Sequence, residues 1–274
     1  MSPRAQRRLA GAGIALLALL LAFPFYWAVV ASLTPEAALF REPSLWPRVL
    51  VPDHYRALFR ERDFWTPIRN SLVVAGATTA LCVTVGAFAA YALARLRFRG
   101  KRPLLAAILA VTMFPQIAIV SPLFLLLRTV GLIDTYPGLV LPYVTFAMPL
   151  AVWLLVGFFR QLPADLEEAA LVDGATRWQS FTRVLLPLSV PGLATTAILT
   201  FIYCWNEFLF ALSFTLGPDR QTVPVAVALF RGQYQVPWGQ ILAATVVATI
   251  PVTVVVLLFQ RRIVQGLSAG GVKG

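Results

Sequence analysis

The sequence is poor in charge and in the side chains from which metal sites and disulfide frameworks are built. Only 13% of its residues are charged, and it contains one histidine, His54, and two cysteines, Cys82 and Cys204. Both cysteines fall within apolar runs, where a thiol behaves as a small apolar side chain, so no disulfide framework is indicated. A lone histidine cannot form a metal cluster. The sequence therefore predicts no metal site and no catalytic residues.

A nucleotide-binding motif is absent as well. No stretch matches G-x-x-x-x-G-K-[S/T], the loop that cradles phosphates, because the glycines near the C-terminus lack its Ser or Thr and a preceding strand. The sequence therefore predicts no nucleotide or other cofactor on this chain.

What the chain does have is long stretches without charge. Each is at least 23 residues long and rich in Leu, Val, Ala, Ile and Phe; they cover 9–35, 70–94, 103–127, 135–159, 184–206 and 232–260. A helix of about 20 apolar residues crosses the hydrocarbon layer and satisfies its own backbone hydrogen bonds there. We therefore expect an all-α integral membrane protein in which residues 1–274 form a single transmembrane domain. Its six transmembrane helices should cover approximately 9–31, 70–94, 104–127, 137–159, 192–213 and 240–260.

The first apolar run follows three arginines, as it would in a cleaved signal peptide. Its apolar core is longer than the usual core of about 7–15 residues, and the bulky rings of 23–27 continue it. We therefore expect a retained first helix.

Basic residues carry the orientation signal. If the N-terminus is cytoplasmic, 14 of the 23 basic residues fall in inside segments, and RLRFRGKRP (95–103) has five bases in nine residues. This asymmetry predicts that both termini are cytoplasmic. It also assigns the net charge of +11 to membrane orientation rather than to nucleic-acid binding.

Prolines lie inside several of the expected helices, where each removes a backbone hydrogen bond and favours a kink. Two interpretations remain open: membrane helices tolerate proline, or the kinks open a cavity and let helices rock. The prolines are Pro24, Pro115, Pro122, Pro142, Pro149 and Pro251. The second helix has no proline and many small residues, which predicts that it packs closely against its neighbours.

One long polar segment, 160–191, interrupts the apolar pattern. It predicts a short helix with acidic residues in its first turn, a left-handed turn at Gly174, and a second helix that starts with a Thr176–Gln179 capping box and stops at Pro187. The first helix would present alanines flanked by carboxylates, which suits docking into a groove of another protein. A solvated loop with ordinary caps explains the same residues.

The spacing within this segment resembles the EAA loop of ABC-importer permeases. Glu168-Ala169-Ala170 is followed after three residues by Gly174, then by Val184 and, one residue on, by Leu186-Pro187, with valine in place of the usual isoleucine. Three further segments resemble MalG-type carbohydrate permeases, and LIDTYPGLVLPYVTFAMPLAVWLL (132–155) resembles members that import trehalose or maltose. The three are MFPQIAIVSPLFLLL (113–127), WNEFLFAL (205–212) and FQRRIVQGLSAGGVKG (259–274).

The resemblance implies a permease subunit of a binding-protein-dependent sugar importer in a bacterial or archaeal cytoplasmic membrane. Its partners would be an ABC ATPase dimer that binds ATP and Mg, a second homologous permease, an extracytoplasmic sugar-binding protein and membrane lipid. Transport would proceed by alternating access, with a trehalose- or maltose-like disaccharide favoured as cargo. The loop would be the coupling helix, and its contact residues would be Glu167, Glu168, Ala169, Ala170, Asp173 and Gly174.

Two further groups of residues are candidates for sugar transport. Trp205, Asn206 and Glu207 lie in the part of the fifth expected helix that would cross the outer half of the membrane, where a charge facing lipid is still costly. They would line the translocation path, Trp205 offering a flat face to a sugar ring; alternatively, Glu207 makes an interhelical hydrogen bond. Residues Gly232, Gln233, Tyr234 and Gln235 of the last outer loop would contact the binding protein, unless that loop packs against other outer loops.

An ion-coupled secondary transporter is the alternative class. It would usually place acidic residues in several helices, often in inverted repeats. Only Glu207 fits that pattern here, and no repeat is evident.

Overall fold

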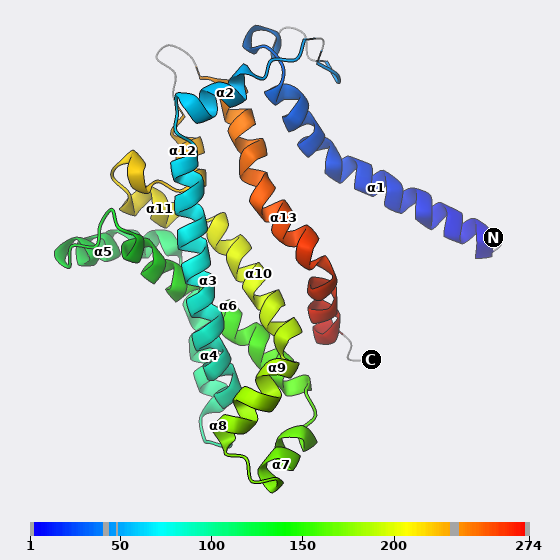
Figure 1. Cartoon of the computed structure of the whole chain (residues 1–274), viewed down its shortest axis with the longest axis vertical. Helices are drawn as coiled ribbons and strands as arrows, with labels where there is room; N and C mark the ends of the chain where they lie inside the picture. Colours follow the sequence, from blue (N-terminus) through cyan, green and yellow to red (C-terminus); the bar gives the residue numbers. More distant parts are fainter. Residues whose placement is uncertain (1–2, 41–43, 48, 231–235, 272–274) are drawn as a thin grey trace. The chain divides into compact units, whose positions relative to one another are not determined.

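The computed structural model describes residues 3–40, 44–47, 49–230 and 236–271, and all the regular structure in these ranges is helical (Figure 1). Within these described ranges, four helices are long and apolar enough to cross a membrane, and the number rises to six if each of two bent helix pairs counts as one span. The all-α membrane fold expected from the sequence is thereby confirmed. The four unbroken helices are α1 (Pro3–Ser32), α3 (Trp65–Ala94), α6 (Tyr136–Gln161) and α13 (Trp238–Gly271).

The chain divides into two compact units, and the first comprises Met1–Trp65 and Val227–Pro251. It contains α1, a 3-10 turn η1 (Glu36–Ala38), α2 (Asp53–Arg60) and the first part of α13. The short helix α2 covers the sequence DHYRALFR.

Polar contacts tie the segments of this first unit together. The Glu36 carboxylate accepts hydrogen bonds from the backbone amides of Trp238 (2.8 Å) and Gly239 (2.9 Å), so it caps the N-terminus of α13. The His54 ring lies against Gly239 so closely that a Cβ there would collide with it. A larger residue at the start of α13 would therefore displace the His54 ring.

The second unit comprises Thr66–Ala226 and Val252–Gly274, and its core lies between α3, α6 and the helices that follow α6. Gly86 of α3 faces α6, where a Cβ built on it would lie 3.5 Å from the Leu155 side chain and 3.7 Å from that of Ala151. This close approach confirms that the second span is a packing helix. Cys82 and Cys204 are both free and buried in the same apolar cluster.

The shorter elements of this unit begin with α4 (Lys101–Ala110), η2 (Val111–Met113) and α5 (Gln116–Thr129). After α6 come α7 (Asp165–Val172), α8 (Arg177–Ser180), the π-helix η3 (Phe181–Leu185), α9 (Leu186–Leu188), α10 (Val190–Trp205), α11 (Leu209–Phe214), η4 (Pro218–Arg220) and α12 (Val223–Ala228).

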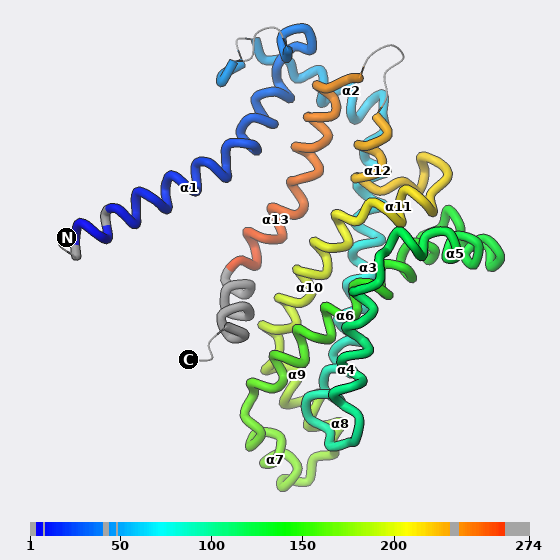
Figure 2. Tube along the Cα trace, turned by 180° about the vertical axis from the view of Figure 1, so that it is seen from behind, coloured from blue at the N-terminus to red at the C-terminus, as the bar shows by residue number. Residues whose placement is uncertain are grey.

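The third span is not the single helix 104–127 that we expected. The chain turns by 91° between α4–η2 and α5, as the green trace in Figure 2 shows. Phe114 has extended backbone angles, which the residue before a proline prefers, and Pro115 has no N–H to continue the helical ladder. The proline breaks this helix rather than kinking it.

The fifth span also differs from the expected helix 192–213. Helix α10 ends at Trp205, and α11 starts only at Leu209. Asn206 and Glu207 therefore lie in a break between two helices rather than within one.

Polar contacts hold the segment that follows α11. This segment lies at the end of the unit opposite to residues 160–191, which are called the elbow below. Asn70 is fully buried, donates to the carbonyl oxygens of Asp219 and Gln221 (2.9 Å each), and accepts from the Tyr136 hydroxyl (2.7 Å). The Arg220 guanidinium lies 4.6 Å from the centre of the Tyr136 ring. These contacts fix the base of the loop that leads to α12.

Candidate functional site

The elbow at 160–191 has the local geometry that the sequence predicted. Gly174 follows α7 with φ +87°, in the left-handed region. The Thr176 hydroxyl accepts from the Gln179 amide (3.2 Å), and the Gln179 side chain accepts from the Thr176 amide (2.8 Å). The glycine turn and the capping box are both confirmed.

The second helix continues from α8 through η3 into α9 and ends at Leu188, one residue after the expected stop at Pro187. The break comes at Ser189, where the chain bends by 72° into α10.

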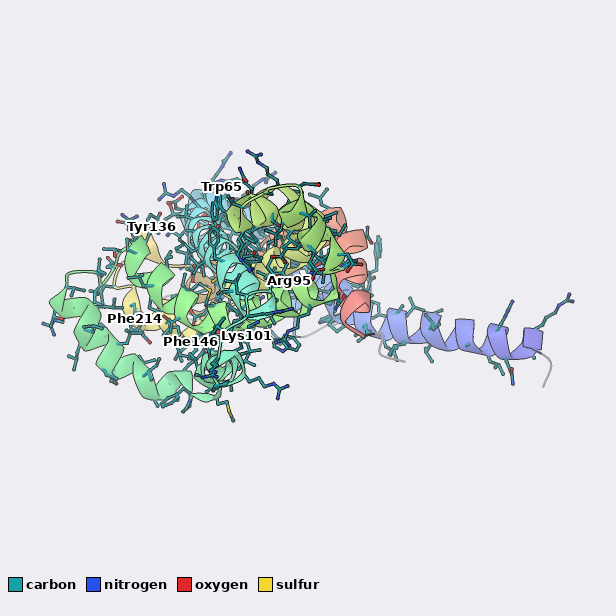
Figure 3. The ribbon with its side chains drawn as sticks, turned by 90° about the horizontal axis from the view of Figure 1, so that it is seen from below. Trp65, Arg95, Lys101, Tyr136, Phe146 and Phe214 are labelled. Carbon is teal, nitrogen blue, oxygen red and sulfur yellow. The ribbon has the colours of Figure 1, made fainter. Side chains whose placement is uncertain are left out.

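The two neighbouring carboxylates of α7 have opposite environments. Glu168 is exposed, whereas Glu167 is only 8% exposed and its Oε1 accepts a hydrogen bond from the Tyr91 hydroxyl of α3 at 2.9 Å. Arg95, which directly follows α3, has its Nε 3.9 Å from Glu167 Oε2 and donates through Nη2 to the Leu162 carbonyl at 2.6 Å. Figure 3 looks at the elbow end of the molecule and labels Arg95. Glu167 therefore faces its own chain, whereas we expected it to face a partner.

Aromatic side chains attach the second half of the elbow to the same helix. Trp178 stacks on Phe88 with ring centres 5.8 Å apart, and Phe181 packs on Tyr91 at 4.6 Å and on Phe159 at 6.3 Å. Both halves of the elbow thus contact α3.

The outward face of α7 carries most of the expected contact residues. Glu168, Ala169, Asp173 and Gly174 are exposed, and Ala170 is half-buried. Apolar side chains accompany them, with Leu166 39% and Val172 87% exposed. The structure thereby brings small, acidic and apolar groups together on one exposed surface.

The break after α10 is organised by Glu207. This side chain is 8% exposed, and its two carboxylate oxygens accept from the backbone amides of Phe210 (2.8 Å) and Ala211 (3.1 Å). The carboxylate therefore caps the N-terminus of α11. Of the two interpretations of Glu207, this arrangement is nearer to the structural one, although its partners are amides of the following helix.

Trp205 and Asn206, the other two residues expected to line the translocation path, have different surroundings from Glu207. Trp205 is 4% exposed and stacks on Phe201 with centres 5.7 Å apart, so its ring is not presented to a sugar. Asn206 is exposed and donates to the Ile202 carbonyl at 2.7 Å.

A polar pair that the sequence analysis missed lies near this break. The Gln116 side chain, in the first turn of α5, donates to the Tyr203 hydroxyl of α10 at 2.7 Å, and both residues are half-buried. Asn206 lies three residues after Tyr203, directly past the end of α10. An amide side chain directly after a proline in an apolar run was the available signal. The expected binding-protein contacts Gly232, Gln233, Tyr234 and Gln235 lie outside the described residues.

Comparison with known proteins identifies relatives over nearly the whole chain. Residues 82–269 match the family described as binding-protein-dependent transport system inner membrane component. The trehalose transport system permease protein SugB of Mycobacterium tuberculosis is 50% identical, over 92% of each chain. The trehalose/maltose transport system permease protein MalG of Thermococcus litoralis is 40% identical, over 96% of this chain and 95% of its own.

Among solved structures, the fold resembles a chain of a bacterial ABC transporter involved in the import of the acidic polysaccharide alginate. The TM-score is 0.79 at 24% identity, and the match covers 95% of this chain and 98% of the other.

Proposed function

The chain belongs to the family of binding-protein-dependent transport system inner membrane components, and from that premise we propose that it is the permease subunit of an ATP-driven importer of a trehalose- or maltose-like disaccharide. Its relatives include permease subunits of trehalose and trehalose/maltose transport systems, which supports the choice of cargo. An ion-coupled secondary transporter finds no support in the comparisons. The observation on which the proposal depends is the exposed face of α7 at the elbow.

In this proposal, ATP and Mg bind a separate ABC ATPase dimer, and α7 docks into a groove of that dimer. A helix of 8 residues that presents alanines and a carboxylate fits a shallow groove lined by Arg or Lys. Glu168, Ala169, Asp173 and Gly174 would be its contacts, with Ala170 at the edge. Glu167 would hold α7 from behind.

We propose a multi-pass arrangement in the cytoplasmic membrane with both termini inside, and treat residues 1–274 as one permease domain. The basic loop that follows α3 and the end of α6 lie at the same end of their unit, because Arg95 bonds to the Leu162 carbonyl. A short loop with five basic residues and the elbow would therefore share the cytoplasmic side.

The sugar path would pass the polar pair near the break after α10. The 13 residues of α4 and η2 (10 plus 3) rise about 20 Å, and Tyr203 is the fourteenth residue of α10, which gives about 20 Å as well. With both helices starting at the cytoplasmic surface of the membrane, the Gln116–Tyr203 pair would lie well inside a hydrocarbon layer about 30 Å thick. Exposed polar groups at that depth are costly against lipid.

We therefore propose that this face of α10 lines the path between this chain and the second homologous permease. Gln116, Tyr203 and Asn206 would contact sugar hydroxyls, while Trp205 and Glu207 form the wall behind them. Residues Gly232, Gln233, Tyr234 and Gln235 remain the proposed contact for the extracytoplasmic sugar-binding protein.

Co-purification and reconstitution test the proposal. The chain should bring down an ABC ATPase and a second permease in stoichiometric amounts. Vesicles containing this complex and the binding protein should take up trehalose or maltose only with ATP. Uptake driven by a proton or sodium gradient without ATP, or purification without an ATPase, would contradict it.

A further inference from the structure

Helix α7 is joined to α3 by a contact between residues far apart in the chain. Glu167 and Tyr91 are 76 positions apart, and the Tyr91 hydroxyl lies 2.9 Å from Glu167 Oε1. The backbone connects α7 to α6 before it and to α8 after it. Any movement of α7 therefore reaches α3 through noncovalent contacts.

Burial makes this contact hard to break. Glu167 and Tyr91 are each 8% exposed, and the side chain of Arg95 is 10% exposed. A carboxylate in such surroundings would lose its hydrogen bond and its cationic neighbour if α7 moved away. Glu167, Tyr91 and Arg95 are together called the Glu167 cluster below.

Arg95 gives the cluster a second possible arrangement. Its Nη2 holds the Leu162 carbonyl at the end of α6, but its buried Nε has no hydrogen-bond partner within the described residues. That nitrogen lies 3.9 Å from Glu167 Oε2, about 1 Å beyond hydrogen-bond distance. A small displacement of α7 toward α3 would close this gap and satisfy the nitrogen.

The aromatic contacts of the elbow lead to the same helix. Trp178 and Phe181 pack on Phe88 and Tyr91, which belong to the last turns of α3. Since Tyr91 takes part in both sets of contacts, α7 and the α8–η3 segment are attached to one short stretch of α3.

We propose that the Glu167 cluster transmits the displacement of α7 to α3, and that its three members are positioning residues for transport. The inference rests on the proposed function, because a partner must move α7. Glu168, on the outer face of α7, contacts the partner that displaces the helix. Glu167, on the inner face, transmits this displacement to α3. None of the three residues contacts sugar or nucleotide.

Matched substitutions in the reconstituted complex test this division. Glu167→Ala and Tyr91→Phe should leave ATPase association unchanged and keep the ATPase rate stimulated by sugar-loaded binding protein within about twofold, while sugar uptake per ATP hydrolysed falls roughly fivefold or more. Glu168→Ala, one residue away, should instead weaken ATPase association, with uptake and hydrolysis falling together.

Arginine variants supply a second pair. Arg95→Gln should lower uptake per ATP in the same way, because it removes the charge beside Glu167. Arg97→Gln removes the same charge from an exposed position in the same loop and should leave the ratio unchanged.

Three results would overturn the inference: an unchanged ratio in Glu167→Ala and Tyr91→Phe, a proportional fall of uptake and hydrolysis in both, or failure of both to assemble. The last would show that the cluster only holds the fold. Failure of the proposed function is seen separately, in the unsubstituted complex, as absent ATPase or absent ATP-dependent uptake.

Discussion

Glu167 and Glu207 are equally buried, at 8% exposure each, but they are stabilised by different kinds of partner. Glu167 is held by side chains at the end of α3, more than 70 positions earlier in the sequence. Glu207 is held by backbone amides three and four positions later. A carboxylate that joins remote elements can pass movement between them, whereas one that caps the next helix stabilises local structure.

Glu207→Ala should have the largest effect of these substitutions, because it should lower the stability of the complex. Loss of Glu167, by contrast, should lower sugar uptake per ATP. Glu207→Ala leaves the amides of Phe210 and Ala211 buried without a partner, at a cost on the order of 3 kcal/mol. The thermal stability and yield of the purified complex should fall, while surviving complexes keep their uptake per ATP. Glu207→Gln retains an acceptor oxygen and should lose less. Full stability combined with lost uptake would instead place Glu207 in the sugar path.

Gly174→Val tests the elbow without touching the Glu167 cluster. Apart from its two chain neighbours, no described residue has an atom within 4 Å of a Cβ built on Gly174, so the effect comes from its φ of +87°, which costs a β-branched residue about 1–3 kcal/mol. Uptake should separate from ATP hydrolysis in reconstituted vesicles. Gly174→Asn is the control, because asparagine tolerates the left-handed region and should be milder. Normal uptake in the valine variant would refute the mechanical role of this turn.

Tyr203→Phe tests the half-buried Gln116–Tyr203 pair, which lies near the buried carboxylate of Glu207. Loss of the hydroxyl removes the hydrogen bond from Gln116 and should raise the KM of sugar uptake about two- to tenfold, with complex stability little changed. Gln116→Leu should act similarly, and the double variant should add little, because both remove one interaction. Additive effects, or an unchanged KM in both single variants, would count against a shared sugar contact.

The smallest effect is expected for Glu168→Gln. An exposed carboxylate contributes less than about 1 kcal/mol to a contact with a basic partner, and salt screens it. ATPase affinity should therefore fall modestly at low ionic strength, and the difference should vanish at high salt. A large loss that is insensitive to salt would mean that Glu168, like Glu167, becomes buried on binding.

The pair Glu167 and Glu168 also shows how far a sequence can be interpreted. Local rules predicted the helix, the turn at Gly174 and the Thr176–Gln179 capping box, because each depends on residues within a few positions. Which of two adjacent carboxylates faces inward depends on Tyr91 and Arg95, and no local pattern contains that information.

Prolines show the same limit for the membrane spans. Pro142 and Pro149 lie inside α6 and are buried, whereas Pro115 separates η2 from α5 and is exposed. All three remove a hydrogen bond, and burial alone does not decide the outcome, because Pro24 and Pro122 are exposed and still lie inside α1 and α5. The composition therefore predicted the number and approximate place of the apolar segments, and it could not predict which of them would bend.

The burial of both native thiols makes this chain suited to site-directed labelling. Cys82 is fully buried and Cys204 is 4% exposed, so neither is open to a water-soluble maleimide in the folded protein. A cysteine introduced on the outward face of α7 would be the reactive one, and a fluorophore or spin label there could follow the elbow during turnover. No cysteine-free background has to be built first.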